Sequence, residues 1–160
     1  MQKGPFGRKD RLIKEKRIDA YRRRGKRPEP TRCPECGAVY VRGRWTWEQA
    51  PENAHEALCP ACRRIRDHYP AGTLFLRGDF FEAHRDEILN LVRNVGKAEM
   101  GEHPLERIID VKNVEGQTEV TTTGVHVARR ILEALARSYE GKSSFQYGDG
   151  AKTLRGCWVR

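Results

Sequence analysis

The sequence lacks any apolar run approaching the roughly 20 residues that a membrane-spanning helix needs. Its first residues, MQKGPFGRKDRLIKEKR, also lack the apolar centre of a secretory signal. We therefore expect a soluble, cytoplasmic protein. At 160 residues, the chain can form one core of moderate size, or a small domain beside a modest one. This length argues against a large multi-step enzyme.

Short motifs of the common enzyme classes are also missing. There is no Walker loop, dinucleotide-binding fingerprint, nucleophile elbow or His-Glu-x-x-His sequence. Two groups of residues offer acids and bases without such a motif: Glu102, His103, Glu106 and Arg107 in EHPLERIIDV, and His84, Glu87 and His126 on the expected helices. His103 precedes Pro104 in an expected loop, and no further group completes a mechanism. We predict that the protein is not an enzyme.

The N-terminal segment contains too few acidic residues to balance its basic ones. Residues 1–32 contain 13 Lys and Arg against four Asp and Glu, so the whole formal charge of +9 lies there and residues 33–160 balance. We predict a basic arm over residues 1–32, disordered by itself, that contacts nucleic-acid phosphates; a solubilising tail is the alternative. The candidate contacts in the arm are Arg8, Lys9, Arg11, Lys14, Lys16, Arg17, Arg22, Arg23, Arg24, Lys26 and Arg27.

Cysteine is limited to five residues, and four of them form two tight pairs, Cys33/Cys36 and Cys59/Cys62. In a chain expected in the cytoplasm, such pairs indicate metal ligation rather than disulfides. The spacing C-x2-C-x22-C-x2-C supplies four soft thiolates, which favour one tetrahedral Zn²⁺. Four cysteines close the coordination shell, so we predict structural zinc. An iron centre held by the same four cysteines, and a reversible zinc or redox sensor, are the chemical alternatives.

The residues around the pairs predict the form of a zinc-binding module over residues 33–70. Gly37 follows the first knuckle, where a positive φ is favourable, and AVYVRGRW then predicts a strand or hairpin. The second pair begins a helix, PACRRIRDHY, whose N-terminus favours thiolate charge. Knuckle, hairpin and helix are typical of a treble-clef or ribbon-like module. We expect His55 and His68 to be surface histidines, and Cys157 to be a small buried residue.

Basic and aromatic residues are interleaved in this module. The candidate nucleic-acid contacts are Arg42, Arg44, Trp45, Arg63 and Arg64. Arginine suits phosphate contacts and exposed tryptophan suits stacking on bases; the alternative is that Trp45 and Trp47 cover the small core. No RNP1 pattern, KH-type GXXG loop or zinc finger of the two-cysteine, two-histidine type is present, so sequence-specific recognition is not expected.

Residues 71–160 alternate between helical and strand patterns after a connecting loop around YPAGTLFLRGDF. Apolar spacings of three and four predict a helix that Asp79 caps and Gly96 ends. ERIIDVKNV and TEVTTT predict a hairpin, GVHVARRILEALARSYEGK a second helix ending at Gly141, and SSFQY with AKTLRGCWVR a second hairpin. The order α-β-β-α-β-β predicts an antiparallel sheet with helices on one face. The fold class is therefore α+β.

The chain resembles a family of small bacterial zinc-ribbon proteins in the signatures CPECGAVYVRGRW, CPACRRIRDHYPAG, HRDEILNLVRN, EHPLERI and VTTTGVHVARRILEAL. This resemblance spans nearly all of the chain after residue 30 and implies little about activity. The knuckles and the stretch leading to the closing hairpin also resemble the N-terminal part of the archaeal and eukaryotic adaptor for export of the large ribosomal subunit. That adaptor has additional cysteine pairs and further domains. The second resemblance implies a zinc-stabilised module that docks on ribosomal RNA.

These observations predict a zinc-stabilised RNA-binding protein of the bacterial cytoplasm, associated with the ribosome in assembly, translation control or dormancy. Its body would dock on RNA while the arm contacts phosphates. A DNA-binding or transcriptional regulator is the first alternative, because the same arm suits DNA. A protein-interaction adaptor is the second, because the body is neutral overall.

Overall fold

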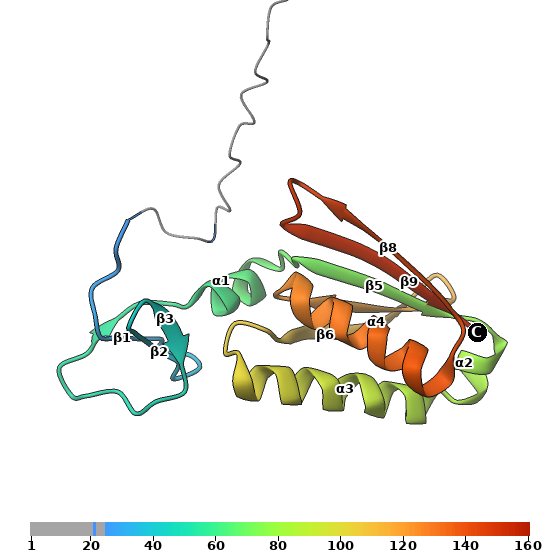
Figure 1. Ribbon diagram of the computed structural model, residues 1–160, viewed down its shortest axis with the longest axis horizontal. Helices are drawn as coiled ribbons and strands as arrows, with labels where there is room; N and C mark the ends of the chain where they lie inside the picture. Colours follow the sequence, from blue (N-terminus) through green and yellow to red (C-terminus); the bar gives the residue numbers. More distant parts are fainter. Residues whose placement is uncertain (1–20, 22–24) are drawn as a thin grey trace, which may run out of the picture.

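Two β-sheets of different size organise the fold (Figure 1). The computed structural model describes residue 21 and residues 25–160. Helices and sheets are both present, which confirms the predicted α+β class. The predicted basic arm lies mostly outside the described residues. In the part of the chain that is described, no helix is both long enough and apolar enough to cross a membrane.

The smaller sheet has the strand order β3-β2-β1-β4, with β1 and β4 parallel and the other neighbours antiparallel. The predicted hairpin after the first cysteine pair is present, and its turn uses Arg42 and Gly43, both at positive φ. The sheet and the helix that follows it comprise β1 (Thr31–Arg32), β2 (Val39–Val41), β3 (Arg44–Thr46), β4 (His55–Glu56) and α1 (Pro60–Asp67).

The larger sheet has the order β6-β7-β5-β9-β8, and three of its four strand pairs are antiparallel. The exception is β5, which pairs parallel with β9. Its unit comprises β5 (Gly72–Arg77), α2 (Asp79–Ala83), α3 (Arg85–Glu102), β6 (Ile108–Val114), β7 (Gln117–Thr122), α4 (Val125–Tyr139), β8 (Lys142–Gly148) and β9 (Thr153–Val159). From α2 onwards, the predicted α-β-β-α-β-β order is confirmed.

The predicted connecting loop was wrong, because most of it is the central strand β5. Leu74 and Leu76 are fully buried under the helices, while Phe75 points to the opposite face beneath the guanidinium of Arg155. The flanking Pro70 and Gly78 resemble loop signals. A run of this length becomes a strand because β7 and β9 hydrogen-bond to its two edges.

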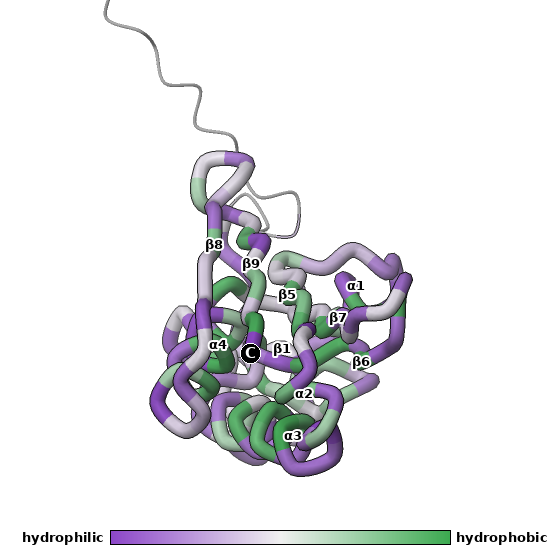
Figure 2. Tube along the Cα trace, turned by 90° about the vertical axis from the view of Figure 1, so that its right-hand side faces the viewer, coloured by the Kyte–Doolittle hydropathy of each residue, from purple (hydrophilic) through white to green (hydrophobic). Residues whose placement is uncertain are grey.

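Helices α3 and α4 cover one face of the larger sheet (Figure 2). The core lies between these layers and includes Leu74 and Trp158 from the sheet, Val92 from α3, and Ile131 and Leu135 from α4, all 0% exposed. Such close packing is expected from two amphipathic helices that need a common apolar surface. The packing fixes where α3 ends and α4 begins, and these two ends face the smaller sheet.

The bounds of the first predicted helix were wrong at Gly96. The helix continues through this residue to Glu102, after an interruption at His84 that separates α2 from α3. A side chain at Gly96 would meet Ile108 of β6, with its Cβ 2.5 Å from the Ile108 Cδ1. Gly96 therefore allows a close approach of helix and strand rather than ending the helix. Asp79 lies in the first turn of α2, and Gly78 occupies the cap position.

Candidate metal centre

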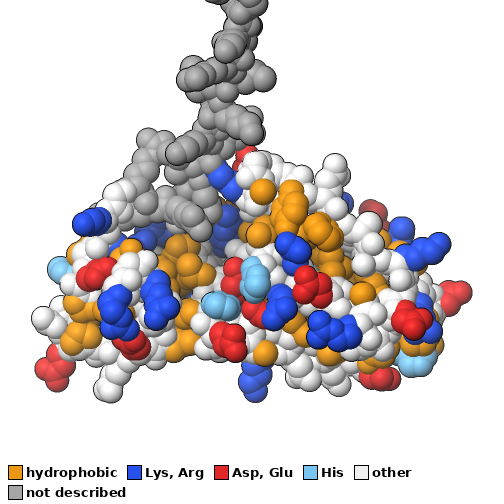
Figure 3. Space-filling model, viewed as in Figure 1, with side chains coloured by type: hydrophobic (Ala, Val, Ile, Leu, Met, Phe, Trp, Pro, Cys, Tyr) orange, Lys and Arg blue, Asp and Glu red, His pale blue; other side chains and the backbone are white. Residues whose placement is uncertain are grey.

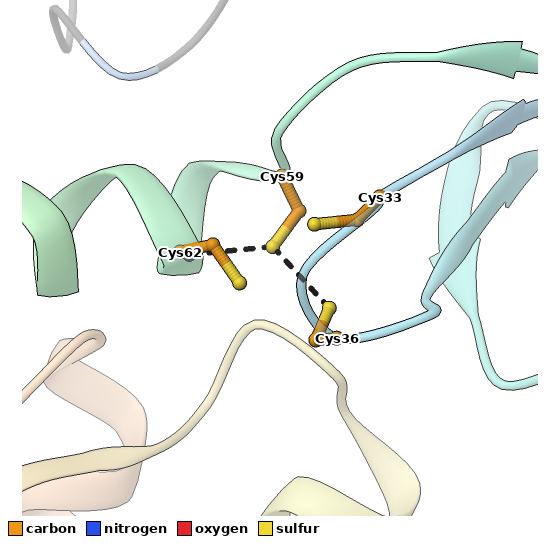
Figure 4. A group of neighbouring side chains, drawn as sticks. All are labelled: Cys33, Cys36, Cys59 and Cys62. Atoms are coloured by element: carbon orange, nitrogen blue, oxygen red, sulfur yellow. Dashed lines mark hydrogen bonds between the residues drawn. The ribbon is translucent and has the colours of Figure 1, made fainter.

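The four paired cysteines converge on one point, as the sequence predicted (Figure 4). Their sulfur atoms all lie within 4.8 Å of one another, and the Sγ atoms of Cys36 and Cys59 are 3.8 Å apart. A tetrahedron with metal–sulfur bonds of about 2.3 Å has edges of about 3.8 Å. The donor set and its spacing therefore fit a tetrahedral metal ion, and these four residues can hold one.

The first pair is shaped by a knuckle between β1 and β2. The backbone amide of Gly37 donates to the Cys33 carbonyl at 2.9 Å, and the Cys33 amide donates to the Ala38 carbonyl at 2.8 Å. Gly37 adopts a φ of +80°, which confirms the expectation for this position. The Ala38 amide also points at the Cys36 sulfur, at 3.5 Å. The turn thus brings Cys33 and Cys36 to the same side of the chain.

The second pair begins α1, which confirms the predicted helix. Cys59 is its N-cap residue, and its sulfur accepts a hydrogen bond from the Cys62 amide at 3.3 Å. Pro60 follows at the first helical position, where its missing amide costs no helical hydrogen bond. The helix N-terminus contributes partial positive charge beside both sulfurs, which favours their thiolate forms.

Arg107 is a contributor to this centre that the sequence did not reveal. Its guanidinium donates hydrogen bonds to the sulfurs of Cys36 at 3.0 Å, Cys62 at 3.3 Å and Cys59 at 3.5 Å. The residue is only 8% exposed, and its Nε donates to the Pro104 carbonyl at 2.7 Å. It comes from the segment between α3 and β6, so a cation from the larger unit lies against the thiols of the smaller one.

The environment changes the pKa values of these groups in different directions. Burial raises the pKa of Cys33, but hydrogen bonds from nearby backbone amides outweigh it and lower the value to about 7. Burial raises the pKa of Cys59, and raises that of Cys62 to about 11 despite the contacts with Arg107. Burial lowers the pKa of Arg107, but hydrogen bonds to Cys62 and Cys36 raise it above its ordinary value. A bound cation would therefore displace protons from the buried thiols.

Further contacts fasten the module to the larger unit. The indole Nε1 of Trp47 donates to the Met100 carbonyl at 2.7 Å, and the Arg107 guanidinium lies 5.8 Å from the centre of the Trp47 ring. Leu105 and Trp45 pack against the buried cysteines. Trp45 is half-buried and covers part of the small core, while Trp47 is 39% exposed and contacts Met100 and Arg107 instead.

A groove of about 1060 Å³ lies where the two units meet. Its module side presents Tyr40, Trp45 and Arg44, and its other side presents His103 and His126. Arg27 covers the aromatic wall, with its guanidinium 5.0 Å from the centre of the Trp45 ring and 5.6 Å from that of Tyr40. A flat cation therefore already lies on the aromatic rings.

The predicted nucleic-acid contacts lie at several places. Trp45, Arg27 and Arg44 line the groove, while Lys26, Arg42 and Arg63 are exposed. Arg42 pairs with Glu48. Arg64 is 5% exposed. Its guanidinium donates to the Tyr69 carbonyl at 3.1 Å and lies over the ring of Tyr21, so it is engaged in contacts within the protein. The remaining arm candidates lie outside the described residues: Arg8, Lys9, Arg11, Lys14, Lys16, Arg17, Arg22, Arg23 and Arg24.

Several residues considered as acids or bases have structural partners. Glu106 accepts a hydrogen bond from the Val127 amide at 3.0 Å and so caps the N-terminus of α4. Glu87 accepts from the Tyr139 hydroxyl at 2.8 Å, and the ring of His84 stacks on Phe80. His55 and His68 are exposed, in agreement with the expectation for them, while Cys157 is half-buried rather than buried.

No protein-family model matches this chain, and no curated protein matches its sequence.

Proposed function

We propose that the chain binds one structural Zn²⁺ through Cys33, Cys36, Cys59 and Cys62. Four thiol donors at tetrahedral spacing favour zinc over harder ions. All four coordination positions come from protein, which leaves none for a substrate. Arg107 offsets part of the negative charge that four thiolates would bring to a buried site. This zinc holds the module in the shape that forms one wall of the groove.

We further propose that the groove binds single-stranded RNA. The observation that carries this proposal is the combination of Tyr40, Trp45, Arg27 and Arg44 on one wall, with Arg27 part of the segment that contains the whole net charge and the other three just after it. Aromatic rings and arginine planes accept stacked bases without regard to sequence, and cations neutralise the phosphates between them. Arg27 already stacks on the rings, so a base can stack beside or in place of it.

Acidic residues also line the groove, but two of the three are engaged. Glu48 pairs with Arg42, and Glu106 caps α4. In contrast, the exposed Arg44 and Arg63 form no ion pair within the described part of the chain. Arg44 therefore provides an available cation on the module wall of the groove. Lys and Arg side chains are visible at several places on this face of the molecule (Figure 3).

Ribosomal RNA is the RNA class that we propose. Folded ribosomal RNA offers narrow, strongly negative crevices, and a chain segment with 13 basic residues among its first 32 suits them better than a globular surface does. The resemblance to the ribosomal export adaptor points the same way. The body would dock at exposed bases, and the basic segment would contact phosphates around them. The cytoplasmic localisation stays a prediction.

Sedimentation with ribosomes tests the proposal. The full chain should co-sediment at low salt, and deleting residues 1–30 or raising the salt should release it. Fluorescence anisotropy with labelled single-stranded RNA, structured RNA and duplex DNA at matched salt then identifies the nucleic acid.

No association with ribosomes or RNA at low salt would contradict the proposal. Tighter binding to duplex DNA would replace it with a DNA-binding function, and a protein partner recovered equally without residues 1–30 would favour an adaptor.

A further inference from the structure

A second group of metal-binding side chains lies on the other wall of the groove. Glu99 belongs to α3, His103 follows the last residue of that helix, and His126 lies in the first turn of α4. Their potential donor atoms all lie within 4.8 Å of one another. His126 Nε2 is 3.1 Å from Glu99 Oε2, and the two imidazole rings meet edge to face at 5.8 Å between centres. Histidine side chains lie beside acidic and basic ones near the middle of this face (Figure 3).

The carboxylate of this group is held in place from one side. The Glu99 side chain is only 11% exposed, and Arg130 Nε donates to its Oε1 at 3.0 Å. The other oxygen, Oε2, is the one that faces His126. Arg130 also approaches Glu133 at 3.6 Å, which offsets part of its positive charge. Metal-binding carboxylates are commonly oriented in this way, by a hydrogen bond to the oxygen that does not coordinate.

We propose that Glu99, His103 and His126 form a second site for a divalent transition-metal ion of the Zn²⁺ type. Two imidazole nitrogens and one carboxylate oxygen are ligands that such ions accept at about 2.0–2.2 Å. Tetrahedral donors at these distances lie about 3.4 Å apart, so atoms of the group that are now up to 4.8 Å apart must approach by up to about 1.4 Å. His103 and His126 are exposed, so their side chains can rotate without disturbing the core. Glu99 Oε2 already faces His126 at 3.1 Å.

This site differs in kind from the four-cysteine centre. Three protein ligands leave at least one coordination position for an exchangeable ligand, whereas four thiolates leave none. His103 and His126 both line the groove, so the remaining position faces it. The ion there would be exchangeable and would place a Lewis acid beside the aromatic wall. Binding would replace the direct contact between His126 and Glu99 that these residues make without a metal.

Titration of the zinc-loaded full chain with ZnCl2 tests this proposal. Isothermal titration calorimetry at pH 7.5, after removal of loosely bound metal, should show one further equivalent. His126→Ala should abolish this equivalent. Glu99→Gln, which keeps an acceptor for Arg130, should lower its affinity by at least about tenfold. His55→Ala, at an exposed histidine of β4, is the matched control and should leave it unchanged.

Spectroscopy locates the added ion independently of affinity. Co²⁺ added to the zinc-loaded chain should shift and broaden the imidazole NMR signals of His103 and His126, while those of His55 stay in place. The added Co²⁺ should not produce sulfur-to-metal charge-transfer bands, because no thiolate binds it. A chain that takes up no second equivalent, or takes it up equally well with His126→Ala and Glu99→Gln, would show that the group is only an ion-pair network.

Discussion

Arg107 donates a hydrogen bond to the sulfur of Cys36 at 3.0 Å, although 71 positions separate the two residues in the chain. The contact joins the segment before β6 to the first cysteine knuckle. It also places a positive charge beside the thiols. Because Arg107 is only 8% exposed, water screens this charge little. Arg107 therefore couples the cysteine cluster directly to the larger unit. Disturbing either partner should affect both.

Replacing Arg107 should destabilise the protein more than any surface arginine does. Removing one partner of a buried charged contact costs about 3–5 kcal/mol, so we expect Arg107→Ala to lower the free energy of unfolding by that order. Arg107→Lys should recover only part, since an ammonium lacks the planar fork that contacts Cys36 and Cys62 together. Urea unfolding with zinc present measures the free energy of unfolding of both Arg107 variants. Arg93→Ala, exposed on α3, is the control, and a similar effect of the two alanine variants would refute the coupling.

Removing the metal should unfold the smaller sheet and leave much of the larger unit folded. Structural zinc supplies the folding free energy of small modules, whereas the core between α3, α4 and the larger sheet does not include the cysteines. After extensive dialysis, metal analysis should return about one zinc per chain. Cys59→Ser should lose it, and Cys157→Ser should retain it. NMR spectra with and without a chelator then show which amides lose dispersion; unchanged spectra after complete metal removal would refute a structural role.

Arg44→Ala should weaken RNA binding through charge and not through folding. Each phosphate contact adds about 0.7 to the slope of log affinity against log salt for single strands, so this slope should fall by about 0.7. Arg137→Ala is the matched control, because Arg137 lies near the far end of α4, about 16 Å along the helix from His126. Anisotropy titrations at several salt concentrations provide the slopes. Equal slopes for Arg44→Ala and the unaltered chain would remove Arg44 from the interface.

Two glycine substitutions should have opposite effects on stability. A Cβ at Gly156 would lie 2.8 Å from Leu74 Cδ2 and 2.9 Å from Leu132 Cδ1, so Gly156→Ala should cost about 1–3 kcal/mol by overpacking. Gly101 lies in the last turn of α3 with open space around it, so Gly101→Ala should stabilise by about 0.5–1 kcal/mol. Thermal unfolding of the two variants checks both signs. Stabilisation by Gly156→Ala would contradict the tight approach of α4 to β9.

Local patterns were sufficient for most of the secondary structure. The two hairpins of the larger unit and α4 follow from alternation, turn residues and helical spacing, and all three are present. The signals for Gly96 and for β5 were misleading, for a common reason. Gly96 is needed within its helix because Ile108 packs against it. The short apolar run between Pro70 and Gly78 is a strand because β7 and β9 pair with it. Such neighbours are distant in the chain and leave no local pattern.

The four candidate metal ligands could be identified without any fold, because a two-residue spacing brings both thiols of a pair to one side of a turn. The location of the net charge likewise follows from the order of residues alone. In contrast, the packing of α3 and α4 against the sheet brought Arg107 to the thiols, Glu106 to the end of α4, and Glu99, His103 and His126 together. Hydrogen bonds act over about 3 Å, so their partners are decided by packing and not by distance along the chain.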